Sequence, residues 1–186
     1  ARGALERLYR GVYRMAGSPL SLPQVMLAAC LTAGPGAMAS HRAGAHVHGL
    51  SVPPILELVV PPGRFVRVPG VLIHRVAGLP RPIVRDGLPV TPPARTLLDV
   101  CGVAPELAED LVIEALVRRV VTVRGLQAEL QRSGQRGRPG TALFRDLVPE
   151  IDPHAPESVL EGRMARLLRA QKPPRPQSQF GALPGV

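Results

Sequence analysis

Hydrophobic and polar positions along the chain predict a short hairpin, a middle region that mixes helices with strands, and then a run of helices. Residues 1–16 alternate between aliphatic side chains and arginines, with glycines between them. This alternation favours two short strands or a hairpin over a helix. The capping-box sequence Ser21-Leu22-Pro23-Gln24 predicts a helix to about Thr32, before Gly34-Pro35-Gly36 ends it.

The middle region begins with a second short helix, which we expect Ser40 to cap and Gly49 to end. β-rich segments follow, separated by proline and glycine. They are 56–60, 65–68 and 71–75. Asp86-Gly87 then lies between two more short β-rich runs and predicts a hairpin. Proline cannot donate to a neighbouring strand, so Pro89 predicts that the second arm of this hairpin is an edge strand.

The second half of the chain predicts helices. Residues 91–99 contain a threonine in the capping position, a proline at the first helical position, and one arginine and one aspartate in an apolar helix. Residues 105–120 carry apolar side chains on one face, acids in the first turns and arginines in the last. Thr122 is expected to cap another helix, residues 133–140 to form a flexible basic linker, and residues 141–147 to form a short helix.

These elements predict an α/β (mixed α+β) protein in three parts. The first is the hairpin of residues 1–16, and the second is a central helical and mixed-sheet domain of residues 17–150. The third, residues 151–186, follows the proline-rich boundary Asp152-Pro153-His154-Ala155-Pro156 and contains a predicted helix from Glu157 before a proline-rich tail.

Composition bears on the partners of the protein. Aromatic residues make up only 3% of the 186 residues, so the core must be aliphatic. The net charge of +9 is typical of proteins that bind nucleic acid. However, 22 of the 23 basic residues are arginine, and 22 prolines and 19 glycines accompany them, as expected of a GC-rich coding sequence. The composition leaves both explanations of the charge open.

The two cysteines, Cys30 and Cys101, lie inside apolar helical patterns. Buried free thiols are therefore favoured over a disulfide, which fits a reducing compartment. The longest apolar run, 25–31, is too short to span a bilayer, and no signal-peptide pattern precedes it. We expect a cytoplasmic protein that does not bind membranes.

Few residues have the spacing of a metal or catalytic site. His41 and His48 can share a helix face, with His46 off it, but no cysteine or carboxylate lies near them in sequence. A capping or core role is therefore favoured over a zinc site, and we expect neither a resident cofactor nor a small-molecule substrate. Arg95 and Asp99, four residues apart, predict a structural salt bridge rather than a functional pair.

Two features are candidates for contact with phosphate. Arg138 precedes a helix N-terminus and can grip a phosphate, although a simple helix lead-in is the favoured interpretation. Arg7, Arg10 and Arg14 lie on the predicted N-terminal hairpin, where arginines contact DNA phosphates in the wing of a winged helix. The hairpin is the stronger candidate for nucleic-acid binding.

Taken in chain order, these motifs resemble the AbiEi-type antitoxin-domain proteins of bacteria, in the subset with a C-terminal very-short-patch-repair-like endonuclease domain. The matching motifs are Leu8-Tyr9-Arg10-Gly11-Val12-Tyr13, Gly34-Pro35-Gly36-Ala37, Ser40-His41-Arg42, Leu58-Val59-Val60-Pro61, Gly70-Val71, His74-Arg75, Asp86-Gly87-Leu88-Pro89-Val90-Thr91, Arg95-Thr96-Leu97-Leu98-Asp99, Gly137-Arg138-Pro139-Gly140-Thr141 and the helix of residues 157–168.

The resemblance implies a DNA-associated antitoxin or transcriptional regulator of a toxin–antitoxin or phage-defence system, with DNA and a cognate toxin as partners. It makes His41, Arg42, Arg95, Asp99 and Arg138 motif positions. It also implies that the hairpin is the remnant of a winged helix that binds operator DNA.

The chain departs from the family at both ends. The recognition helix expected before the hairpin is missing, as are the acidic strands expected after Phe180, so we expect a chain that is truncated at both ends and not catalytic. The alternative is the N-terminal portion of a Vsr-like, Mg²⁺-dependent DNA endonuclease. In that alternative, Glu161 matches a family acidic position.

Overall fold

The computed structural model describes residues 4–148, which form a mixed α/β structure. In these residues lie six helices, a two-stranded hairpin and a five-stranded mixed sheet. The strands are β1 (Leu5–Tyr9), β2 (Val12–Met15), β3 (Met38–Ala39), β4 (Glu57–Val60), β5 (Leu72–Arg75), β6 (Ile83–Arg85) and β7 (Leu88–Val90). The helices are α1 (Leu22–Ala33), α2 (His41–Val47), α3 (Pro93–Val103), α4 (Pro105–Val117), α5 (Val123–Ser133) and α6 (Thr141–Leu147).

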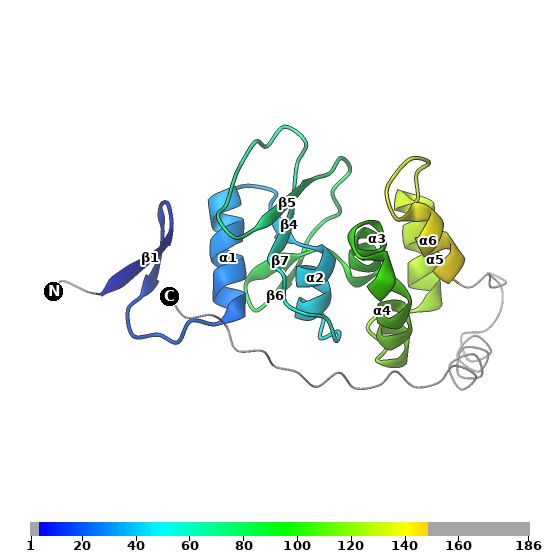
Figure 1. Ribbon diagram of the computed structural model, residues 1–186, viewed down its shortest axis with the longest axis horizontal. Helices are drawn as coiled ribbons and strands as arrows, with labels where there is room; N and C mark the ends of the chain where they lie inside the picture. Colours follow the sequence, from blue (N-terminus) through cyan, green and yellow to red (C-terminus); the bar gives the residue numbers. More distant parts are fainter. Residues whose placement is uncertain (1–3, 149–186) are drawn as a thin grey trace. The chain divides into compact units, whose positions relative to one another are not determined.

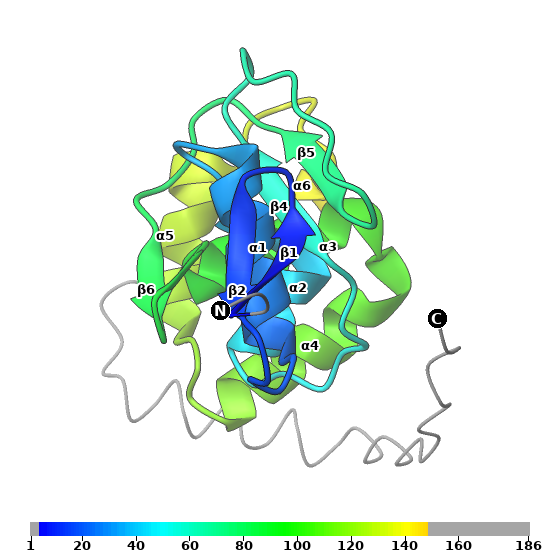
Figure 2. The ribbon, with the colours of Figure 1, turned by 90° about the vertical axis from the view of Figure 1, so that its left-hand side faces the viewer.

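The five-stranded sheet has the order β5-β4-β3-β7-β6. Its central strand, β3, pairs antiparallel with β4 and parallel with β7, and β4 pairs parallel with β5. Helix α1 covers one face and α2 the other, with α3 to α6 packed beyond α2 (Figure 1). The β1–β2 hairpin lies against α1, on the side of that helix opposite the sheet (Figures 1 and 2).

Two separate hydrophobic cores hold this arrangement together, and both are largely aliphatic. One lies mainly between α1 and the sheet, around Met26, Leu58 and Val90. The other joins α3 to α6 around Leu97 and Phe144. Burial of aliphatic surface is the main stabilising contribution in each core. The segments that pass from one core to the other carry buried polar residues, among them Ser40 and Thr91.

Most of the predicted elements are confirmed. Residues 5–15 form a hairpin, and the capping box at Ser21 is present, with the Ser21 hydroxyl accepting from the Gln24 backbone. Thr122 caps α5 through the backbone N–H of Gly125. The hairpin turn at Asp86-Gly87 joins β6 to β7, with both residues at the positive φ such a turn needs.

Two strand predictions were wrong. Residues 65–68 form a loop rather than a strand. The strand that contains Pro89 lies inside the sheet, between β3 and β6, rather than at its edge. The physical reason is the shortness of β3, which pairs with β7 only through Ala39 and Val90. Since the parallel ladder begins at Val90, the missing N–H of Pro89 leaves no gap in it.

Two capping predictions were also wrong. Thr91 lies one residue before the N-cap of α3, which is Pro92, and the Thr91 hydroxyl does not cap the helix. Ser40 occupies the N-cap position of α2, but its hydroxyl bonds no backbone N–H of that helix. Both hydroxyls instead join a buried polar network, and that tertiary use explains why the local capping rule failed.

Within residues 4–148, none of the helices has the length and apolar composition that crossing a bilayer requires. The described residues belong to one compact unit, residues 1–150. The predictions for residues 151–186, including the helix from Glu157 and the acidic position Glu161, lie outside the described residues.

Candidate functional site

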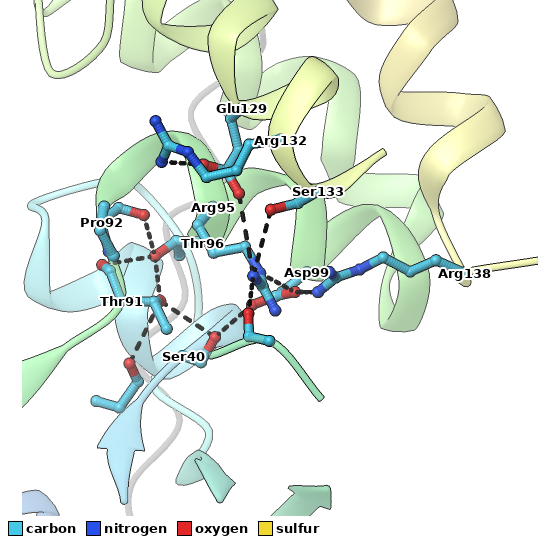
Figure 3. Close-up of polar contacts among 12 residues, drawn as sticks. Ser40, Thr91, Pro92, Arg95, Thr96, Asp99, Glu129, Arg132, Ser133 and Arg138 are labelled. Atoms are coloured by element: carbon cyan, nitrogen blue, oxygen red, sulfur yellow. Dashed lines mark hydrogen bonds and ion pairs between the residues drawn. The ribbon is translucent and has the colours of Figure 1, made fainter. Parts of the chain in front are cut away.

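The centre of the site is an ion pair on α3, which confirms the contact predicted between Arg95 and Asp99. The Arg95 Nε lies 3.0 Å from Asp99 Oδ1, and the two residues are only 1% and 5% exposed. Arg138, from the loop before α6, places its Nη2 2.7 Å from the same oxygen. The Ser40 hydroxyl donates to Asp99 Oδ2 at 2.9 Å. One carboxylate therefore joins three segments that are far apart in sequence (Figure 3).

A chain of hydroxyl groups connects this ion pair to the sheet. Thr91 Oγ1, directly after β7, donates to Ser40 Oγ at 3.1 Å and lies 2.6 Å from Thr96 Oγ1. The Thr91 backbone N–H donates to Ala39 O at 2.9 Å. The turns that lead into α2 and α3 are thus locked to each other by hydrogen bonds (Figure 3).

Helix α5 closes the other side of Arg95. The Arg95 Nη1 lies 3.5 Å from Ser133 Oγ and 4.0 Å from Glu129 Oε1, and Glu129 also pairs with Arg132 at 3.1 Å. Arg95 Nη2 and Glu129 Oε1 are buried without a hydrogen-bond partner. Arg95 therefore connects α3 to α5 through its contacts with Ser133 and Glu129.

A second cluster surrounds Glu57, which is fully buried on β4. Arg42 binds its carboxylate with both Nη2, at 2.7 Å, and Nε, at 3.0 Å, and also donates its backbone N–H at 2.9 Å. His74 Nε2 of β5 lies 3.5 Å away. Burial raises the pKa of Glu57, but the nearby His74 ring and the hydrogen bonds from Arg42 outweigh burial and bring the pKa to about 2.

His41 links the two clusters. It has a φ of 53°, in the left-handed region that residues other than glycine rarely adopt, and is 5% exposed. Its ring stacks on that of His74, with centroids 3.9 Å apart. Burial lowers the pKa of His41 to about 4, although the nearby Asp99 charge opposes this shift. The positive φ of His41 is a strained backbone conformation, and the packing around the buried side chain maintains it.

The predicted role of the histidines is confirmed for two of the three. His41 and His48 are buried, and His48 Nε2 lies 2.8 Å from the Thr91 carbonyl oxygen. Burial is also the main cause that lowers the pKa of His48. His46 is exposed. Within residues 4–148, no three His, Cys, Asp or Glu side chains gather as metal ligands would. Cys30 and Cys101 are buried free thiols, as predicted.

The predicted phosphate contacts have different surroundings. Arg7 and Arg10 are exposed on the hairpin. Arg14 is partly buried, pairs with Glu6 across the hairpin and donates to the Ser18 carbonyl oxygen. Arg138 is bound to Asp99 rather than turned to solvent. Of the four arginines, two thus have the exposure that a phosphate contact needs.

Two buried glutamates of these clusters were not predicted from the sequence. Glu57 is the single charged residue in the apolar segment 56–60, and that pattern is itself a signal of a buried, paired carboxylate. Glu129 follows ordinary helical spacing and carries no such signal. The stacking of His41 on His74 joins residues from a helix and a strand, which no local pattern predicts.

The buried carboxylates of these two clusters are paired with arginines. Glu57, Asp99 and Glu129 each contact at least one arginine. Carboxylates of a metal-dependent nuclease converge on a cation instead, with oxygens free to bind it. Comparison of the chain with protein-family models, curated proteins and solved structures found no match. The function proposed below therefore depends on the sequence resemblance described above and on the geometry of the chain's own residues.

Proposed function

We propose that this chain is a DNA-associated, antitoxin-like or transcriptional-regulator-like protein of a toxin–antitoxin or phage-defence system, acting in the cytoplasm without catalysis. The observation that carries the proposal is the exposed hairpin with Arg7 and Arg10, which lies at one end of the described fold (Figure 1). Arginines on such a hairpin contact the phosphate backbone and supply affinity without reading bases.

The distribution of charge supports this proposal. Residues 4–90, which include the hairpin and the sheet, contain nine arginines and three acidic residues. Residues 91–148 contain eight arginines and seven acidic residues. The excess positive charge therefore lies in the part that carries the hairpin and the sheet, because acidic residues are scarce there. Such asymmetry steers a polyanion toward one side of a protein.

The paired carboxylates support the non-catalytic part of the proposal. Each buried acid of the described fold contacts arginine, so its negative charge holds the fold together rather than binding a cation. The alternative, the front portion of a Vsr-like endonuclease, depends on Glu161, outside the described residues. Mg²⁺-dependent nicking of plasmid DNA by the whole chain would favour that alternative.

We expect the whole chain to bind duplex DNA with an affinity that falls steeply as salt concentration rises. Replacing Arg7 and Arg10 by alanine should lower the slope of log affinity against log salt by about 2, since each lost phosphate contact removes about 0.9. Fluorescence anisotropy with a labelled duplex at several salt concentrations measures this slope.

The matched control replaces Arg136 and Arg145, two exposed arginines of the helical half, by alanine. This variant loses the same net charge but should keep the wild-type slope to within about 0.5. Binding that does not depend on salt, no binding at low salt, or equal loss in both variants would contradict the proposal.

A further inference from the structure

Strand β5 lies at one end of the five-stranded sheet, and no strand of residues 4–148 pairs with its outer edge. Within the described residues, β5 pairs with β4 alone. The Leu72 N–H donates to Leu56 O at 2.9 Å, and the Val76 N–H donates to Val60 O at 3.1 Å. Since backbone groups alternate in direction along a strand, the N–H and C=O groups of Ile73 and Arg75 point away from β4. An open edge of this kind is a template for another strand.

Side chains on both faces of this edge are unusually exposed for their type. Leu72, on the face shared with Glu57 and α2, is 49% exposed. On the opposite face, Phe65 is 86% exposed, and the Arg75 guanidinium lies over its ring at 5.4 Å from the centroid. Large apolar side chains left exposed beside an open edge indicate a surface that another chain covers.

The positive charge of the β5 edge indicates which kind of partner chain can bind there. Arg75 is exposed on this edge, and Glu57, which lies opposite Leu72 on β4, is buried and paired with Arg42. A second copy of this chain would bring the same arginines together, so like charges would oppose the pairing. DNA has no row of N–H donors to match the open C=O groups. An extended acidic peptide satisfies both the backbone and the charge.

We propose that the β5 edge, defined as Ile73, Arg75, Leu72 and Phe65, binds an extended segment of a partner protein in which acidic and apolar residues alternate. The segment adds a strand to the sheet. Its apolar side chains cover Leu72, and its acidic side chains meet Arg75. This inference goes beyond the DNA association proposed above and does not use the hairpin, so each proposal can fail without the other.

The experiment uses the whole chain and two short, end-capped, fluorescent peptides, one alternating glutamate with valine and one alternating lysine with valine. We expect the glutamate peptide to bind at least about tenfold more tightly than the lysine peptide. Hydrogen exchange should show slower exchange of the Ile73 and Arg75 amides when the glutamate peptide is bound.

Ile73→Pro removes the N–H that points away from β4 and also shortens a side chain that packs against the core between α1 and the sheet. It should weaken binding of the glutamate peptide about tenfold while the β4–β5 ladder stays intact. The matched control, Ile73→Val, keeps the N–H and should bind as the wild type does. Circular dichroism checks that both variants fold. Should Ile73→Pro not fold, Arg75→Glu serves instead and should reverse the preference toward the lysine peptide.

Several results would overturn the proposal. They are equal binding of both peptides, no binding of either, binding that a folded Ile73→Pro variant or Arg75→Glu leaves unchanged, and no change in exchange at Ile73 and Arg75. A dimer that Ile73→Pro dissociates would identify a second copy as the occupant. Slower exchange of the same amides with duplex DNA, but not with the glutamate peptide, would identify nucleic acid.

Discussion

Replacing Asp99 by alanine should lower the free energy of unfolding by about 3–5 kcal/mol, the range for breaking one side of a buried ion pair. The variant leaves Arg95, which is 1% exposed, without its nearest negative charge. It also removes the acceptor for Ser40 and the partner of Arg138. A protein of this size has a total stability of about 5–15 kcal/mol, so the loss should be visible as a shifted urea midpoint.

Asp146→Ala is the matched control, because Asp146 is exposed on α6 and its loss should change stability by no more than about 0.5 kcal/mol. A further variant, Arg95→Met with Asp99→Leu, removes both charges of the pair. Its loss of stability should be about 1–3 kcal/mol smaller than the sum of the losses of the single variants Arg95→Met and Asp99→Leu, and this difference is the coupling energy of the pair. An Asp99→Ala variant as stable as the control would show that the network does not hold the helices to the sheet.

The importance of this network comes from its place between two cores. The core between α1 and the sheet and the core of α3 to α6 have separate sets of residues. Ser40 and Thr91 end the sheet segments, and Asp99 belongs to the helical layer. Directional polar bonds therefore fix the orientation of the helices on the sheet, which two nonspecific apolar contacts alone would leave less defined.

Local chemistry explains which parts of the fold could be predicted from the sequence. Three correctly predicted features depend on residues that are adjacent or nearly adjacent in sequence, so a local pattern is enough to predict them. They are the Ser21–Gln24 capping box, the Asp86-Gly87 turn and the Thr122 cap. Arg95 and Asp99 are four residues apart on a helix, and their pairing follows from helical geometry.

Tertiary contacts explain why the predictions for Pro89, Ser40 and Thr91 were wrong. Whether Pro89 lies at an edge depends on the length of β3, fifty residues earlier in the chain. The hydroxyls of Ser40 and Thr91 have two possible uses, and only the position of Asp99 decides between helix capping and the network. Tertiary position likewise gives Arg138, in the loop before α6, its partner Asp99 on α3, and no local pattern indicates that pair.

Lowering the pH from 6.5 to 4 should remove about 3 kcal/mol of stability through His41 alone. The folded pKa of His41 is about 4, below the value of 6.5 for an exposed histidine, because the ring is buried. In this window the unfolded chain takes up a proton that the folded protein does not, so stability falls as the pH falls. Burial lowers the pKa of His48 as well, which adds a smaller loss in the same range.

Glu57 contributes in a separate window. Its folded pKa of about 2 lies below its ordinary value of 4.5, so its stabilising contribution is present above pH 4.5 and is lost as the pH falls toward 2. Loss of stability between pH 6.5 and 4 therefore reports on buried histidines, and the further loss at lower pH reports on the Glu57 cluster.

His41→Asn tests this assignment, since asparagine tolerates the positive φ of 53° and does not titrate. Urea unfolding at several pH values should show that the variant loses the steeper part of the decline between pH 6.5 and 4, while the slope caused by His48 remains. His46→Asn, which alters an exposed histidine of the same helix, should follow the wild-type curve. If His41→Asn and the wild type declined in parallel across this range, the proton that destabilises the fold would bind at another group, and folding would not lower the pKa of His41.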